Sequence, residues 1–458
     1  MASGGGLLDL VARGKKDTFF TQNPKISFFH SVYPKAGPST QEIRLTQPRN
    51  RPEWGRWTDF DIEFVGDIMR NPVLLIDLPT WLPVTQARQN KTSITTDLSG
   101  VQYGYSQDVG ALMIEKVQLF MDQYLVHEFW GQWLEWRVST ESKAPIYGSI
   151  GGRHSTSLCK FATPKQLRVY LPLLGNQGPG DKGFPLVALH KQNFRIRVHL
   201  RRLEELIEAS DGRLNPIPWQ RDFLQKINKT DAPIPFKTLP RSLIPGPLMA
   251  LETTQVYIPG DAQELLKKTV LNVPFRQVQL CQFTIEDSKW FPIVNSNSPV
   301  TLALTLDFVG AMSRITVGVQ TDASIRAGQR YNLAAPVGGP NQFIQSLRLN
   351  NGTKDRLNEW QAIIWRDVSN YYKNDREARD PLENPLNIYT LTFGGGDIHT
   401  PLGTFNMSRS DTQALYVSLS AIANDSRLNS RKAYIYVFGE SWNILEVKDG
   451  KAKLLFAN

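Results

Sequence analysis

Short segments in which apolar and polar residues alternate recur along this chain, separated by clusters rich in Pro, Gly, Asn and Ser. Alternation with a period of two is typical of strands that bury one face, and few windows keep the 3.6-residue period of a long helix. The pattern therefore predicts an all-β fold. The clearest expected strands are Phe60–Val65, Lys116–Met121, Phe194–Leu200, Val300–Val309, Ala414–Leu419 and Ala433–Phe438.

Turn and helix signals divide the chain further. The pairs Asn351-Gly352 and Asp449-Gly450 lie between apolar segments and are suited to positive φ, so each predicts a tight hairpin. One segment, DAQELLKK, reads as a helix that Asp261 can cap, with Glu264 three positions later. This helix follows a Pro-rich stretch and predicts a domain boundary.

An internal repeat supports two domains. A strand ending near Leu119 is followed eleven residues later by Trp130, and a strand ending near Leu349 is followed at the same spacing by Trp360, about half a chain length further on. A Trp-Arg pair follows in each copy: Trp136-Arg137 in the first and Trp365-Arg366 in the second. We expect each copy to contain a strand, a turn, a second strand and a short helix, with Trp130 and Trp360 buried on those helices.

Composition narrows the class of protein. The sequence has 458 residues with 52 Lys and Arg against 43 Asp and Glu, a net charge of +9, but most windows mix both signs. Mixed signs without a concentrated basic patch argue against specific nucleic-acid binding. The two cysteines, Cys159 and Cys281, are too few for a disulfide scaffold and favour a reducing compartment.

The strand Phe194–Leu200 carries the main local excess of basic residues. Arg195 and Arg197 alternate with apolar residues, and Arg201 follows directly, so one strand face is basic and the other apolar. Two interpretations are open for Arg195, Arg197 and Arg201: a solvated strand face or a surface that contacts a partner.

Signals for catalysis are weak. The six histidines lack metal-ligand spacing, no G-x-S-x-G motif occurs, and the Gly-rich stretches lack the context of a phosphate-binding loop. We therefore expect no catalytic residues, no metal and no cofactor. The alternative from another class is a β-sandwich glycosidase or carbohydrate-binding protein, which would need a cleft with two carboxyl groups about 5–10 Å apart. Its candidates are Glu135, Glu204, Glu205, Glu252 and Glu440.

Several motifs, in order along nearly the whole length, resemble one family. These include GGGLLDLVARGKKDTFFTQNPKISFFHSVYP, IEKVQLFMDQYLVHEFWGQWLEW, VYLPLLGNQGPGDKGFPLVALHKQNFRIRVHL, GTFNMSRSDTQALYVSLS and AYIYVFGESWNILEVKDGKAKLLFAN. The chain resembles the double-jelly-roll major capsid proteins of nucleocytoplasmic large DNA viruses, especially those of algae and amoebae. Two departures are Pro401-Leu402-Gly403, where the family commonly has Pro-Ser-Gly, and Asp122-Gln123, a turn without the usual glycines.

The resemblance implies two tandem eight-stranded antiparallel jelly rolls with short helices in the loops and linker. Its implied limits are an arm at 1–25, a first jelly roll at 26–259, a helical linker at 260–270 and a second jelly roll at 271–458. It also implies a structural, non-enzymatic major capsid protein that forms homotrimeric, pseudo-hexameric capsomers of an icosahedral shell. A minor capsid protein of the same fold is the nearer alternative.

Further expectations concern the partners and the arm. The resemblance implies contacts with neighbouring capsomers, with minor capsid proteins and with an internal viral membrane at the capsomer base, in virions assembled in the host cytoplasm.

The first residues offer an apolar helical face followed by basic residues, which we interpret as an assembly arm rather than a core strand or a frayed tail. The arm residues are Leu7, Leu8, Leu10, Val11, Arg13, Lys15 and Lys16.

Overall fold

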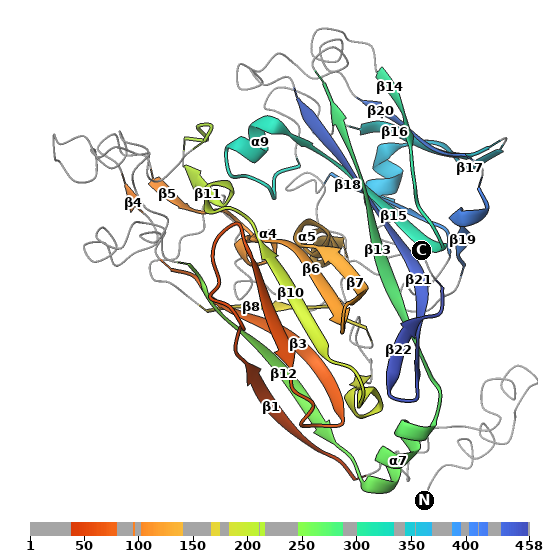
Figure 1. Ribbon diagram of the computed structural model, residues 1–458. Helices are drawn as coiled ribbons and strands as arrows, with labels where there is room; N and C mark the ends of the chain where they lie inside the picture. Colours follow the sequence, from red (N-terminus) through yellow and green to blue (C-terminus); the bar gives the residue numbers. More distant parts are fainter. Residues whose placement is uncertain are drawn as a thin grey trace, which may run out of the picture. The chain divides into compact units, whose positions relative to one another are not determined.

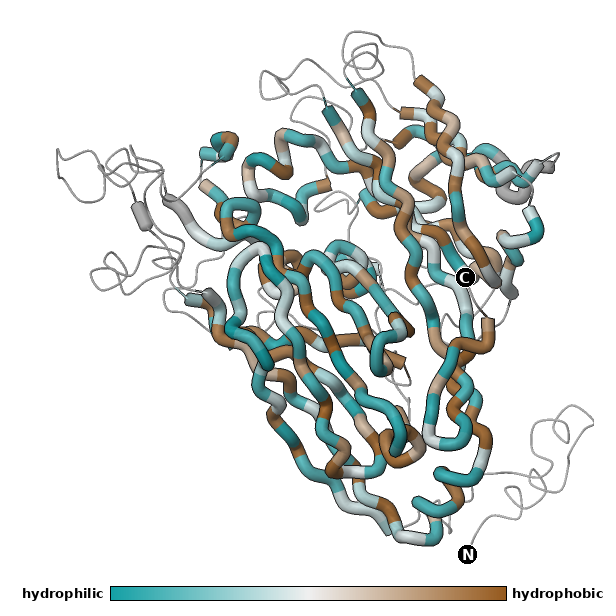
Figure 2. Tube along the Cα trace, viewed as in Figure 1, coloured by the Kyte–Doolittle hydropathy of each residue, from teal (hydrophilic) through white to brown (hydrophobic). Residues whose placement is uncertain are grey.

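Antiparallel sheets dominate the structure, a computed structural model (Figure 1). It describes residues 38–79, 95–96, 102–140, 166–174, 183–209, 211–215, 246–286, 300–333, 344–352, 354–368, 387–394, 403–410, 412–419 and 432–456. Figure 2 shows hydrophilic and hydrophobic residues alternating along the strands of both halves. In β10 (Phe194–Leu200), for example, every second residue is buried, as the sequence pattern predicts.

The first half of the chain forms two four-stranded sheets and two smaller additions. One sheet has the order β1-β12-β3-β8, with β9 added to β3: β1 (Thr40–Thr46), β12 (Leu248–Tyr257), β3 (Ile68–Asp77), β8 (Gln166–Tyr170) and β9 (Phe184–Pro185). The other has the order β2-β10-β6-β7: β2 (Trp57–Ile62), β10, β6 (Ile114–Met121) and β7 (Tyr124–Trp130). A short sheet contains β11 (Ile207–Ala209), β5 (Gln102–Tyr105) and β4 (Thr95–Thr96).

The second half repeats this arrangement. One sheet has the order β13-β21-β15-β18, with β19 on β15 and β22 on β21: β13 (Leu271–Ile285), β21 (Ala433–Lys448), β15 (Ala311–Thr321), β18 (Ile388–Thr392), β19 (Phe405–Asn406) and β22 (Lys451–Leu454). The other has the order β14-β20-β16-β17: β14 (Val300–Thr305), β20 (Gln413–Leu419), β16 (Ile344–Asn351) and β17 (Lys354–Gln361).

The two halves therefore share one topology. Numbering the eight main strands of each half in chain order gives 1-8-3-6 and 2-7-4-5 for the paired sheets both times. This is the strand order of a jelly roll, in which two sheets enclose one core. The expected fold class of two tandem eight-stranded antiparallel jelly rolls is confirmed.

Short helices connect the strands. They are α4 (Val109–Leu112), α5 (Gly131–Thr140), α7 (Gly260–Lys268), α9 (Asp322–Arg326), the 3-10 turns η2 (Leu186–Leu189), η3 (Leu203–Glu205) and η7 (Met407–Arg409), and the π-helical turn η6 (Ile364–Val368). Helix α7 lies between the last strand of the first half and β13, where the sequence predicts a linker helix (Figure 1). The predicted cap is wrong: Pro259 is the N-cap residue and makes no side-chain bond, so Asp261 lies within the first turn.

The repeat has the predicted order of elements, but two tryptophans are misplaced. Trp130 ends β7 and Trp360 lies in β17, so both are on strands rather than helices, and Trp360 is 48% exposed. Their positions also differ by one residue. Val117 of β6 and Leu347 of β16 are equivalent, because Val117 pairs with Val198 of β10 and Leu347 pairs with Val417 of β20. On the other side, Val117 pairs with Phe129 and Leu347 pairs with Trp360. Trp360 thus corresponds to Phe129.

The Trp-Arg pairs agree with the repeat. Trp136-Arg137 lies on α5 after β7, and Trp365-Arg366 lies on η6 after β17, with all four side chains buried. The hairpin predictions also hold. Asp449 and Gly450 both have positive φ between β21 and β22, and Gly352 has positive φ in the turn between β16 and β17.

Candidate functional site

The two jelly rolls meet through buried polar groups rather than through apolar side chains alone. Glu440 of β21 accepts hydrogen bonds from Arg314 Nε at 2.7 Å, from Arg276 Nη1 at 3.0 Å and from the indole nitrogen of Trp133 at 2.9 Å. All four side chains are at least 97% buried. Trp133 belongs to α5 of the first half, so this carboxylate joins a helix of one jelly roll to three strands of the other.

Strand register brings the two arginines to Glu440. Arg314 of β15 lies directly opposite Glu440 of β21, and Arg276 of β13 lies opposite Trp442 on the other side of the same strand. Removing Glu440 takes the shared counter-charge from two buried guanidinium groups in a low-dielectric environment, and breaking a buried ion pair in this way costs about 3–5 kcal/mol. The cluster therefore specifies how these elements pack.

A second polar cluster surrounds Arg330. Its guanidinium donates to Glu205 Oε2 at 2.5 Å, and its backbone carbonyl accepts from Gln132 of α5 at 3.4 Å and from Gln320 of β15 at 2.7 Å. The pKa of Arg201 is lowered to about 10, mainly by burial and to a smaller extent by the nearby positive charge of Arg330. Residues from both jelly rolls thus share one enclosed set of charges.

Glu208 of β11 forms a third contact between the halves, but with neutral donors. Its Oε1 accepts from Gln329 Nε2 and from the Tyr331 hydroxyl, both at 3.1 Å. The side chain is 1% exposed, and burial raises its pKa to about 7, with the two hydrogen bonds acting in the opposite direction. Burial likewise raises the pKa of Tyr331.

His127 of β7 packs against the second half as a neutral group. Its ring lies 5.3 Å from that of Phe275 and 5.5 Å from that of Phe129, measured between centroids. Burial is the main cause that lowers its pKa to about 3, and the charges of Arg137 and Arg276 act in the same direction. The imidazole therefore serves as a packing group at neutral pH.

The basic strand singled out from the sequence is neutralised by its neighbours. Arg197 makes a bidentate pair with Asp59 at 2.7 and 3.0 Å and lies over the ring of Trp57 at 4.3 Å. Arg195 pairs with Asp61 at 2.9 Å. Arg201 lies beyond the end of β10 and is largely enclosed beside Glu205 and Arg330, so it does not share a surface with the other two. A partner role for Arg195, Arg197 and Arg201 stays a prediction.

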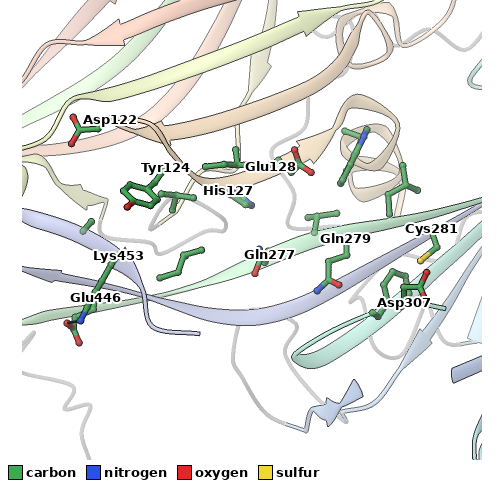
Figure 3. Close-up of a pocket in the computed structure, with 18 of the residues that line it drawn as sticks. Asp122, Tyr124, His127, Glu128, Gln277, Gln279, Cys281, Asp307, Glu446 and Lys453 are labelled. Carbon is green, nitrogen blue, oxygen red and sulfur yellow. Dashed lines mark ion pairs between the residues drawn. The ribbon is translucent and has the colours of Figure 1, made fainter. Parts of the chain in front are cut away.

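A cleft of about 1440 Å³ lies between β7 on one side and β13, β21 and β22 on the other (Figure 3). None of the five glutamates considered for a glycosidase lines it. Glu440 is held by two arginines, Glu252 pairs with Arg168, and Glu135 accepts from Ser139 at 2.9 Å. The glutamates named from the sequence therefore do not meet in this cleft.

Grouped metal ligands and membrane-length apolar helices are both absent from the residues that the structure describes. No group of three or more His, Cys, Asp or Glu in that part of the chain is arranged to hold a metal ion. No helix among those residues is long and apolar enough to cross a membrane. The arm residues Leu7, Leu8, Leu10, Val11, Arg13, Lys15 and Lys16 lie outside the described residues.

The sequence did not single out Arg276, Arg314 or Glu208, and it named Glu440 only as one of five unranked acids. The alternation of β21 gave no signal for Glu440, because Glu440 is in phase with the half-buried residues Tyr436 and Trp442 rather than with the fully buried ones. Which charges meet depends on the register of three strands that are far apart in sequence, and the pattern of one strand does not contain that information.

Comparisons with known proteins agree with the fold. No protein-family model matches the chain. A major capsid protein of Pyramimonas orientalis virus is 20% identical over 466 residues, covering 99% of this chain and all of that protein. Capsid protein 1 of Acanthamoeba polyphaga mimivirus is 26% identical over 223 residues, and a probable capsid protein 4 of the same virus is 25% identical over 213 residues. These two matches span 36% and 38% of the mimivirus proteins.

Solved structures give the same fold from end to end. The crystal structure of PBCV-1 VP54 has a TM-score of 0.68 with 13% identity, covering 94% of this chain and all of that one. The Faustovirus major capsid protein has a TM-score of 0.59 with 12% identity, covering 95% and 94%. The fold and the junction thus define a double-jelly-roll protein. The chain is a homologue of the major capsid proteins of large algal and amoebal viruses, and the resemblance stated from the sequence is confirmed.

Proposed function

We propose that this chain is a major capsid protein, the structural building block of the shell of a large icosahedral DNA virus. The observation that carries the proposal is the end-to-end match to the Pyramimonas orientalis virus major capsid protein, together with the same jelly-roll strand order in both halves. The function is assembly, which needs no covalent chemistry, and we infer that the chain is not an enzyme.

The capsomer is a homotrimer. Two similar jelly rolls per chain give a trimer six similar wedges, and such a pseudo-hexagonal unit can pack in a flat lattice with closed symmetry inside each unit. The corresponding limits are 26–259 for the first jelly roll, 260–270 for the linker and 271–458 for the second. Neighbouring capsomers, minor capsid proteins and an internal membrane are its partners, in virions assembled in the host cytoplasm.

The oligomeric state tests this proposal. Light scattering on the purified chain at micromolar concentration should give the mass of three chains of 51.8 kDa, with no dependence on concentration in that range. A monomer under those conditions contradicts the capsomer. Electron microscopy of the native assembly then distinguishes a major from a minor capsid protein, because only a major protein occupies most positions of the shell.

The first residues form an assembly arm in this proposal. Leu7, Leu8, Leu10 and Val11 supply an apolar face, and Arg13, Lys15 and Lys16 supply positive charge for a partner at the capsomer base. Deleting residues 1–20 should leave the trimer and its thermal stability nearly unchanged while impairing shell formation. Loss of the trimer on deletion contradicts an arm that acts only in assembly, and normal shells from the shortened chain show that the arm is dispensable.

A further inference from the structure

Two strands at the junction have free edges that face each other. β13 is the outermost strand of its sheet and pairs with β21 alone, and β7 is the outermost strand of its sheet and pairs with β6 alone, among the residues that the structure describes. The two strands lie side by side without a hydrogen-bonded ladder between them (Figure 1). The cleft of about 1440 Å³ occupies this space (Figure 3).

The residues that line the cleft show that strand edges form its walls. Seven consecutive residues of β13, Gln277–Phe283, and five consecutive residues of β7, Tyr124–Glu128, line it. Successive side chains of a strand point to opposite faces, so consecutive residues all line a cleft only where the backbone edge itself faces it. Unpaired N–H and C=O groups of an edge are a template for another strand. Seven residues span about 23 Å along a strand.

The chemistry of the walls specifies the sequence of such a strand. Apolar side chains are supplied by Leu125, Leu280, Phe283 and Leu454. Five carboxylates line the cleft against three lysines; Glu446 is paired with Lys453 at 3.1 Å and Glu128 with Lys116 at 3.4 Å, which leaves three aspartates against two lysines. Asp122 and Asp307 lie at opposite ends of the row of residues that line the cleft (Figure 3). The walls therefore favour a segment that is apolar on one face and basic on the other.

We propose that the cleft binds an extended segment of another polypeptide, with alternating apolar and basic residues, as a strand added to the free edge of β13. Main-chain hydrogen bonds supply the affinity, and the apolar and acidic wall residues select the side chains. This inference goes beyond the proposed function, because it assigns a peptide site to the isolated chain whatever shell the chain forms.

The test uses a fluorescein-labelled octapeptide of alternating valine and lysine and the purified full-length protein, with binding followed by fluorescence anisotropy. We expect saturable binding in the micromolar range, which is typical of a short strand that must be ordered on binding. Leu125, which is 41% exposed on β7, is changed to Lys, and this should weaken binding at least about tenfold by adding like charge beside the peptide. The matched control is Leu45→Lys on the free edge of β1, where the side chain is 57% exposed and binding should not change.

The peptide itself provides a readout that does not depend on folding of a variant. N-methylation of every second amide removes the hydrogen-bond donors along one edge of the peptide. Two such peptides are possible, one methylated at the odd-numbered amides and one at the even-numbered amides, and they lose the donors of opposite edges. Strand addition to β13 predicts that one methylation pattern abolishes binding, and bridging to β7 as well predicts that both do. Three results overturn the proposal. The unmethylated peptide and both methylated peptides bind equally, the two leucine substitutions weaken binding equally, or no saturable binding occurs up to millimolar peptide.

Discussion

Glu440 and Glu208 are both buried carboxylates at the junction, yet their partners differ in kind. Glu440 is bound by two guanidinium groups and an indole N–H, whereas Glu208 is bound by an amide and a hydroxyl. A charged partner favours the ionised carboxylate, while burial among neutral donors favours the protonated form. The same residue type therefore contributes to the junction in two ways, which only its neighbours determine.

Replacing Glu440 by Gln tests the charged cluster. The substitution keeps the shape of the side chain but leaves Arg276 and Arg314 buried without their shared counter-charge, so the free energy of unfolding should fall by about 3–5 kcal/mol in chemical denaturation at pH 7. Glu53→Gln, which breaks the exposed Glu53–Arg56 pair, is the control and should change little. Equal stability of the two variants contradicts a structural role for the cluster.

Glu208→Gln tests the neutral cluster through pH. Because burial raises the pKa of Glu208 from 4.5 to about 7, the folded chain binds a proton that the unfolded chain has lost between those values. The native chain therefore gains stability as pH falls from about 7 towards 4.5 and loses it as pH rises through 7, with a limiting slope of about 1.4 kcal/mol per pH unit. The Gln variant lacks this slope. Urea unfolding at pH 5, 6, 7 and 8 measures the difference between the two proteins.

Parallel pH profiles for wild type and the Glu208→Gln variant contradict this assignment. Comparing the two proteins removes the contribution of His127, which has the opposite sign: its lowered pKa makes stability fall as pH drops from 6.5 towards 3. The difference profile thus reports Glu208 even where both groups titrate.

At the scale of elements, the sequence predicted strands well because each strand carries its own pattern. The alternation in Phe194–Leu200 and the turn Asp449-Gly450 are local signals, and the structure has both. The cap at Asp261 and the burial of Trp360 failed for different reasons. Pro259, two residues before Asp261, is already the N-cap of the helix. Trp360 lies on the outermost strand of its sheet, where it stacks on Trp365 with ring centroids 5.1 Å apart instead of entering the core.

The packing of α5 on β15 gives a prediction at this scale. Gly318 of β15 lies against the indole of Trp136, and a Cβ at position 318 would overlap that ring. Gly318→Ala should therefore force the helix away from the strand and cost roughly 1–3 kcal/mol, measured by thermal unfolding. Gly260→Ala in α7 is the matched control, because nothing lies within 4 Å of the added methyl group and alanine favours a helix. Its melting temperature should be unchanged or higher.

At the scale of the whole chain, the sequence predicted two jelly rolls but not how closely they are joined. The apolar core of the first jelly roll continues into side chains of the second, including Phe275, Val278, Phe438, Leu445 and Val447. A separate core surrounds residues such as Met312 and Leu415 in the second half alone. The repeat indicated two similar units, but contacts between units depend on side chains that differ between the copies, such as Glu440 and Glu208.

The shared core predicts that the described halves unfold together. Separating them would expose Phe275 and Phe438 and would leave Glu440 without the hydrogen bond from Trp133, so we expect each half to lose stability without the other. Calorimetry of the full-length protein should show one endotherm, although chains with two domains often show two. The scan is repeated at two protein concentrations. A transition caused by dissociation of a trimer changes its temperature with concentration, whereas the unfolding of two linked halves gives one endotherm at both concentrations.

A fragment ending at residue 270 should lack the near-UV circular dichroism of fixed aromatic side chains. Two resolved endotherms at both concentrations, or a folded fragment, contradict a single cooperative unit.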